Sequence, residues 1–127
     1  MKASGAPQAF PKALRLRGRG EFRRVYEEGQ RRSAPLCAVF FRSNGLPHSR
    51  LGITAPARVG KAVIRNRMKR RLREVFRRNQ AVIAPGWDIV VNPRPVVATI
   101  PFPKLERDLL KLFPGQPPPE SPEKNQE

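Results

Sequence analysis

The sequence predicts a small two-layer α/β sandwich, in which three helices cover one mixed sheet of about four strands. Two observations predict this class. Residues 61–79 carry apolar side chains at the spacing of one helical face. The runs 36–42 and 87–92 are rich in the β-branched and aromatic side chains that strands favour. The predicted order of helix, strands, helix, strand and helix describes helices packed on a sheet.

The segment 61–79 dominates the chain. Its apolar side is formed by Ile64, Met68, Leu72, Val75 and Phe76. The opposite side carries Asn66, Arg70, Arg73 and Arg77, and the flanks carry Arg65, Lys69, Arg67, Arg71 and Arg78. Like charges three and four residues apart each cost a few tenths of a kcal/mol, so such a helix is unfavourable alone. The pattern therefore predicts an anionic partner, and it is typical of proteins that bind phosphate backbones.

Composition narrows the class of protein. The 127 residues suffice for one domain, and the formal net charge of +16 favours nucleic acid as the partner over an anionic membrane surface. Neither a run of about 18 apolar residues nor a secretory signal is present, so we expect a cytoplasmic protein that does not associate with membranes. One cysteine and one histidine exclude an internal disulfide, a multi-cysteine zinc site and a histidine-based triad or metal site.

The first elements are a disordered basic arm at residues 1–13 and a short helix at 21–29. In that helix Phe22, Val25 and Tyr26 share one face, and Gly29 lies where a C-terminal cap belongs. A short strand follows at 30–33.

The run 36–42 is a second strand, and the Asn-Gly and Pro of 43–49 indicate a chain reversal. The alternating segment 50–55 is then expected to return as a strand. We therefore predict that 36–42 and 50–55 pair as an antiparallel hairpin.

The remaining elements follow the basic helix. Residues 87–92 form a strand that the following prolines end. Residues 102–113 place apolar side chains at helical intervals, with lysine and arginine outward. Residues 114–127 contain no apolar side chain other than proline and predict a disordered Pro-rich tail, leaving 14–113 as the folded domain that would bind nucleic acid.

The sequence offers little for self-contained catalysis. Its acidic residues show neither paired-carboxylate nor metal-ligand spacing, so no catalytic and no metal-ligating residue is assigned. We expect Asp88 to serve structure or solvation, His48 to be a solvated turn residue and Cys37 to be a small buried apolar residue. The glycines of the RGRG segment lack the continuation of a P-loop. Binding is therefore better supported than chemistry.

Four aromatic residues lie near the basic segments, and such rings can stack on unpaired bases. They are Phe22, Tyr26, Phe40 and Phe41. For any one of them, packing in the core is the competing interpretation. Because Phe40 and Phe41 are consecutive, their rings must face opposite sides of a strand, so one can be buried while the other lines an open face.

The run 60–77, GKAVIRNRMKRRLREVFR, resembles the signature of the protein subunit of bacterial ribonuclease P. It follows the strand-like segment 51–54, as the family pattern requires. The resemblance extends upstream to EFRRVYEEG at 21–29 and downstream through DIVV at 88–91 to the last helix, covering about residues 14–113.

The resemblance implies a sandwich with an uncommon left-handed βαβ crossover, against the usual right-handed rule. It also implies a ribonucleoprotein endoribonuclease that removes the 5′ leader of precursor tRNA. Its catalytic RNA would carry the active site and the magnesium ions, and the protein would bind this RNA and the leader and aid activity at low magnesium. The partners implied are ribonuclease P RNA and precursor tRNA with its leader.

The resemblance also implies roles for particular residues. The RNA-contacting set would be Arg65, Asn66, Arg67, Lys69, Arg70 and Arg73. The cleft for the single-stranded leader would be lined by Phe22, Tyr26 and Phe40. The chain departs from the family pattern at 55–58, where Ala-Pro-Ala-Arg replaces a lysine-rich approach to the helix, and at 92–94, where Asn-Pro-Arg replaces Ala-Arg.

Three alternatives share parts of this pattern. A ribosomal-type structural RNA-binding protein would have the same basic helix but no preference for a leader. A protein-only nuclease is disfavoured by the few acidic residues. Membrane-surface binding is disfavoured because the apolar side of the basic helix is needed for the core.

Overall fold

The computed structural model describes residues 11–115. The helices are α1 (Gly18–Glu28), α2 (Ala62–Arg78) and α3 (Phe102–Leu112). The strands are β1 (Gln30–Ala34), β2 (Cys37–Ser43), β3 (Arg50–Ile53) and β4 (Trp87–Pro93). Within the described residues, these three α-helices and one four-stranded mixed sheet confirm the predicted α/β class.

Helix α1 begins at Gly18, three residues before the predicted start. The side chain of Glu21 stabilises this earlier start, since its Oε1 accepts a hydrogen bond from the backbone N–H of the N-cap residue Arg17 at 2.6 Å. The helix ends at the predicted cap, Gly29. A Cβ atom at Gly29 would lie 2.5 Å from the carbonyl oxygen of Phe41, so a larger residue does not fit there.

The predicted hairpin between 36–42 and 50–55 is wrong. The strand order is β1-β2-β4-β3, so β4 lies between β2 and β3. β4 pairs antiparallel with β2 and parallel with β3, whereas the true hairpin joins β1 to β2. The reason is burial: every residue from Trp87 to Val91 is buried, and a strand that is buried on both faces belongs in the centre of a sheet.

The parallel neighbours β3 and β4 are connected through α2, which gives the βαβ crossover that the family resemblance implies. The left hand of this crossover stays a prediction. Helix α2 agrees with the predicted 61–79 to within one residue at each end.

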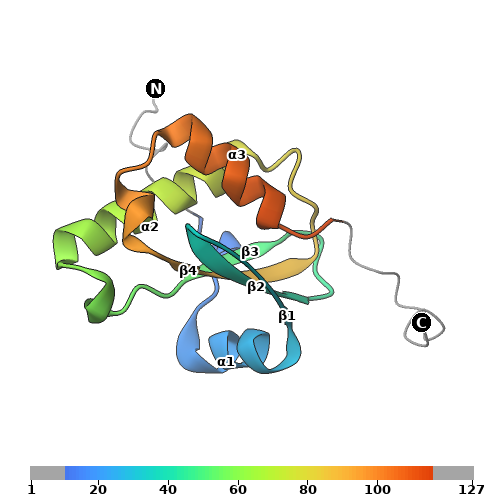
Figure 1. Cartoon of the computed structure of the whole chain (residues 1–127). Coiled ribbons are helices and arrows are strands. Elements are labelled where there is room, and N and C mark those ends of the chain that lie inside the picture. The colour runs from blue at the N-terminus through green and yellow to red at the C-terminus, as the bar shows by residue number, and fades with distance from the viewer. Residues whose placement is uncertain (1–10, 116–127) are drawn as a thin grey trace.

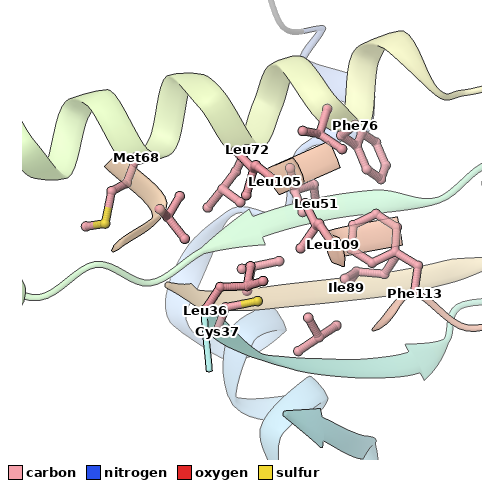
Figure 2. Packing of buried hydrophobic residues seen from close by; sticks show 14 of the residues in the cluster. Leu36, Cys37, Leu51, Met68, Leu72, Phe76, Ile89, Leu105, Leu109 and Phe113 are labelled. Carbon is pink, nitrogen blue, oxygen red and sulfur yellow. The ribbon is translucent and has the colours of Figure 1, made fainter. Parts of the chain in front are cut away.

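The main core lies between the sheet and helices α2 and α3, which cover one face of it, while α1 crosses the other face (Figure 1). Figure 2 shows Met68, Leu72 and Phe76 projecting from α2 toward the strands. These three side chains are at most 1% exposed, as the helical spacing predicted. The sheet contributes alternate residues to this face, among them Leu51 and Ile89.

A smaller apolar cluster lies under α1 on the opposite face. Val25 of α1 and Val90 of β4 are fully buried there, together with Leu16. Helix α1 approaches β3 closely because residue 52 is glycine: a Cβ atom on Gly52 would lie 2.6 Å from Cζ of Phe22. The glycine therefore lets the Phe22 ring lie directly on the sheet.

Described residues on both sides of the predicted domain 14–113 contact the fold. Residues Lys12–Leu14 form a short 3-10 turn, and Nε2 of His48 lies 3.0 Å from the carbonyl oxygen of Ala13. At the other end, Nε1 of Trp87 donates a hydrogen bond to the carbonyl oxygen of Gly115 at 2.6 Å. The rest of the predicted arm and tail lies outside the described residues.

The assignment of faces on α2 can be tested by stability. Met68→Asp places a carboxylate in the core without a partner, and we expect it to lower the free energy of unfolding by about 4 kcal/mol or more. Arg70→Ala is the matched control, because Arg70 is exposed on the same helix. Thermal unfolding followed by circular dichroism measures both. A cooperative transition at the wild-type temperature in Met68→Asp would contradict the assigned faces.

Candidate RNA-binding surface

The predicted RNA-contacting residues of α2 differ in exposure. Asn66, Arg67 and Arg70 are exposed, whereas Arg65, Lys69 and Arg73 are half-buried. Of these six, Asn66, Lys69 and Arg70 have no hydrogen bond or ion pair to another described residue. Their polar groups are therefore available to a ligand.

Two members of the set also contact the protein backbone. The Nε atom of Arg65 donates to the carbonyl oxygen of Gly60 at 3.1 Å, and that of Arg67 donates to Ala98 at 2.5 Å. The neighbouring Arg71, which was not in the set, donates to the carbonyl oxygens of Val97 and Ile100 at 2.7 and 2.6 Å. One flank of the basic helix therefore stabilises the chain around the 3-10 turn Pro95–Ala98.

Two arginines of α2 have lowered pKa values. Burial is the main cause that lowers the pKa of Arg73, and the nearby charge of Arg15 lowers it further. Burial is also the main cause that lowers the pKa of Arg71, and the nearby charge of Arg67 lowers it further. Arg15 lies far from α2 in the sequence, and its segment is placed beside the sheet by a bridge to Leu51. Spacing within the helix could not have identified it.

The three predicted cleft residues form one cluster. Phe22, Tyr26 and Phe40 are all half-buried and pack on the smaller apolar cluster under α1. The rings of Tyr26 and Phe40 meet edge to face with centroids 4.8 Å apart. Phe41, on the opposite face of β2, is buried against Trp87 in the main core. The consecutive phenylalanines thus divide as predicted, one on each face.

A groove runs along α1 beside these rings, with a volume of about 610 Å³. It is lined by Gly18, Arg19, Phe22, Arg23, Tyr26, Glu27 and Thr54. The hydroxyl of Tyr26 lies 2.8 Å from Oγ1 of Thr54 and 2.9 Å from Oδ1 of Asn92. The groove therefore combines aromatic faces, a polar floor and two arginines, which suits a single-stranded nucleic acid.

Sequence reasoning missed Thr54 and Asn92 as neighbours of the groove. Both lie two residues beyond positions on the α1 face of the sheet, namely Gly52 and Val90, so the period-two alternation of strands would have placed them on that face. The missing information was the pairing of β3 with β4, since the predicted hairpin separated the two residues.

A second hollow, of about 400 Å³, is lined mainly by basic residues of the N-terminal segment together with His48 and Arg50. Arg50 is fixed there: it binds both carboxylate oxygens of Asp88 at 2.8 Å and one oxygen of Glu21 at 3.1 Å. These contacts raise the pKa of Arg50, and the hydrogen bond to Asp88 is the largest cause. Because Asp88 is only 4% exposed, it serves as the structural partner of this arginine.

Among residues 11–115, no three or more histidine, cysteine, aspartate or glutamate side chains gather where they could hold a metal. Cys37 lies fully buried in the main core, and burial raises the pKa of its thiol to about 12. A thiol with such a pKa stays protonated and is a poor nucleophile near neutral pH.

Comparison with known proteins decides the family. The family model described as Ribonuclease P matches residues 10–115. The ribonuclease P protein component of Thermotoga maritima is 47% identical over 87 residues, which cover 68% of this chain and 74% of that protein. The chain belongs to the ribonuclease P protein family. It is thus a subunit of ribonuclease P, a ribonucleoprotein endoribonuclease that processes tRNA.

Other members of the family agree with this assignment. The component from Syntrophobacter fumaroxidans is 41% identical over 100 residues, covering 78% of this chain and 84% of that protein. The solved ribonuclease P protein of Thermotoga maritima matches with a TM-score of 0.72 and 42% identity, over 78% of this chain and 94% of that one. The Staphylococcus aureus ribonuclease P protein matches with a TM-score of 0.71 and 29% identity, over 80% and 93% of the two chains.

Family membership makes ribonuclease P RNA the partner of this chain. The fold contributes one further observation: within residues 11–115, none of the helices combines the length and the apolar character needed to cross a bilayer.

The buried thiol predicts a pH dependence of stability. The folded state keeps Cys37 protonated up to about pH 12, whereas the thiol of an unfolded chain ionises near ~8.5. The contribution of the buried thiol to the free energy of unfolding is therefore complete below pH ~8.5, and it is lost as the pH rises toward the pKa of the folded state. We expect the stability difference between wild type and Cys37→Ala to shrink by about 2 kcal/mol between pH 8 and pH 10.

Urea unfolding at each pH measures this difference. Parallel pH profiles for the two proteins would contradict the assignment. So would rapid modification of Cys37 by a thiol reagent under native conditions.

Proposed function

We propose that this chain binds the catalytic RNA of ribonuclease P through the exposed side of α2 and holds the 5′ leader of precursor tRNA in the groove along α1. The RNA carries out the endonucleolytic cleavage and holds the magnesium ions that it requires. The observation that carries the proposal is the groove itself, where two half-buried aromatic side chains, Phe22 and Tyr26, lie beside Arg19 and Arg23.

The exposed side of α2 supports the RNA-binding part of the proposal. Asn66, Lys69 and Arg70 lie free of protein partners among the described residues, and the planar fork of arginine matches phosphate with two parallel hydrogen bonds. Arg73, half-buried on the same helix, adds a further cation to this surface. Arg65 and Arg67 belong to the same surface while also contacting backbone carbonyls.

The groove supports the leader-binding part. Its aromatic members Phe22 and Tyr26 form one cluster with the neighbouring Phe40, and each base stacked on such a ring contributes roughly 1 to 3 kcal/mol. Stacking recognises the faces of the bases more than their edges, which carry the sequence, so the groove suits leaders of varied sequence. Since precursor tRNA is made in the bacterial cytoplasm, we place the function there.

The deciding experiment is cleavage of precursor tRNA by bacterial ribonuclease P RNA at low magnesium, with and without this protein. RNA alone should be slow, because its phosphates repel those of the substrate. We expect strong stimulation for a substrate with a leader of several nucleotides and weak stimulation for one with a single nucleotide. Phe22→Ala combined with Tyr26→Ala should remove that preference but leave binding to the catalytic RNA intact.

Equal stimulation of both substrates by the wild-type protein would overturn the leader-binding groove. Tight, salt-sensitive RNA binding without any stimulation would instead favour a structural RNA-binding role, like that of ribosomal proteins.

Salt dependence tests the role of α2 separately. The logarithm of the affinity for the catalytic RNA should fall linearly with the logarithm of the salt concentration. The slope should be roughly 0.7 to 0.9 for each phosphate that the protein neutralises. Arg70→Ala should reduce the slope by about one such increment and leave thermal unfolding unchanged. Arg107→Ala, which removes the same charge from the exposed side of α3, serves as the control and should not reduce the slope. An unchanged slope in Arg70→Ala would remove this residue from the RNA-binding set.

A further inference from the structure

The aromatic cluster of the groove is part of a row that crosses the whole sheet. Phe22 lies on β3 at Gly52, Tyr26 reaches Asn92 of β4, and Tyr26 also meets the ring of Phe40 on β2. The last strand in that direction is the edge strand β1. A ligand that follows the rings from β3 toward β2 therefore arrives at β1.

Arg31 stands at the end of this row. It is the register partner of Phe40, and its guanidinium carbon lies 5.8 Å from the centre of the Phe40 ring. The side chain is exposed and forms no ion pair with an acidic residue among residues 11–115. A guanidinium held over a ring directs its N–H groups outward in its own plane, so contact with the ring orients them without using them.

The next residue, Arg32, has a different environment. It projects to the opposite face of β1, where its guanidinium carbon lies 4.9 Å from the centre of the Phe41 ring. Its Nη1 donates to the carbonyl oxygens of Leu112 and Phe113 at 3.4 and 3.1 Å. Arg32 therefore stabilises the end of α3. Two consecutive arginines on one strand thus serve different faces, and only Arg31 faces the groove side.

The distribution of charge along the groove leaves a place for Arg31. Arg19 and Arg23 lie on the part of α1 that begins over β3, and Glu27 is the groove residue closest to the end of α1. A phosphate passing Glu27 meets an unfavourable charge. Arg42, on the same face of β2 as Phe40, is paired with Glu28 at 2.8 Å, whereas Arg31 has no acidic partner among residues 11–115. The geometry thus provides cations at both ends of the aromatic row.

Strand spacing gives the length of this path. Three intervals of about 4.8 Å separate β3 from β1, or about 14 Å in all. At about 3.4 Å per nucleotide in a stacked strand, this distance corresponds to about four nucleotides. Arg31 is therefore out of reach of a very short leader.

We propose that Arg31 is a further leader-binding residue, which contacts a phosphate of the leader as it leaves the aromatic groove over β1. This proposal rests on the proposed function of the groove. It adds that the protein measures leader length: affinity rises until the leader reaches Arg31 and then stays constant.

The test uses the holoenzyme, reconstituted with ribonuclease P RNA, and precursor tRNAs with leaders of one to ten nucleotides. For wild type we expect affinity to rise in steps and level off. Arg31→Ala should bind long leaders about tenfold more weakly, which is the loss of one charge-assisted contact, and should bind the shortest leader as wild type does. For long leaders, its salt slope should fall by roughly 0.7.

Three variants make the comparison specific. Arg31→Lys keeps the charge without the planar group, and we expect it to restore the salt slope and part of the affinity. Arg32→Ala removes an equal charge from the opposite face and should bind every leader as wild type does. Arg107→Ala removes an equal charge from the exposed side of α3. It replaces Arg32→Ala as the control if Arg32→Ala unfolds at a much lower temperature than wild type.

The failures are distinguishable. If wild type shows the length dependence and Arg31→Ala retains it in full, Arg31 has no role while the groove keeps its function. An equal loss in Arg31→Ala and in a folded control would also overturn the proposal, because the effect would then be one of net charge. If wild type binds all leaders equally, the proposed function of the groove fails first.

Discussion

The structure depends on one constraint, the burial of β4 on both faces. Ile89, Val90 and Val91 are consecutive and fully buried, which a strand achieves only where both faces of the sheet are covered. Helices α2 and α3 cover the face of Ile89 and Val91, and α1 covers that of Val90. β4 must therefore lie between β2 and β3. The chain reaches it from β3 through α2, and this crossover fixes the basic helix against the sheet.

The basic residues of α2 have two tasks, and its geometry separates them. The carbonyl groups around the 3-10 turn Pro95–Ala98 lack the partners that a longer helix would supply, and Arg67 and Arg71 satisfy three of them. Removing one such arginine would leave buried acceptors unpaired. A count of positive charges thus overstates the number of side chains that are free for RNA, and the exposed side centred on Asn66 and Arg70 is the part that can bind without structural loss.

The groove results from close packing elsewhere. Because Gly52 has no side chain, Phe22 lies directly on β3, and α1 is brought near enough for the Tyr26 hydroxyl to reach Thr54 and Asn92. This polar contact fixes the Tyr26 ring, whose edge then packs against Phe40. A rigid aromatic surface loses little conformational freedom on binding, which favours recognition of a flexible single strand. Asn92, one of the departures from the family pattern, contributes to that rigidity in this chain.

The sequence by itself determined the elements whose signal is local. Helical spacing placed Met68, Leu72 and Phe76 in the core and Arg70 outside it, and strand alternation put Phe40 and Phe41 on opposite faces. The signature in 60–77 also determined the family. Only the tertiary structure decided the neighbours of each strand, because pairing depends on which faces other elements cover, and no local pattern records that. The same reason hid Thr54, Asn92, Arg15 and Arg31 from the sequence: each gains its place through contacts between segments far apart in the chain.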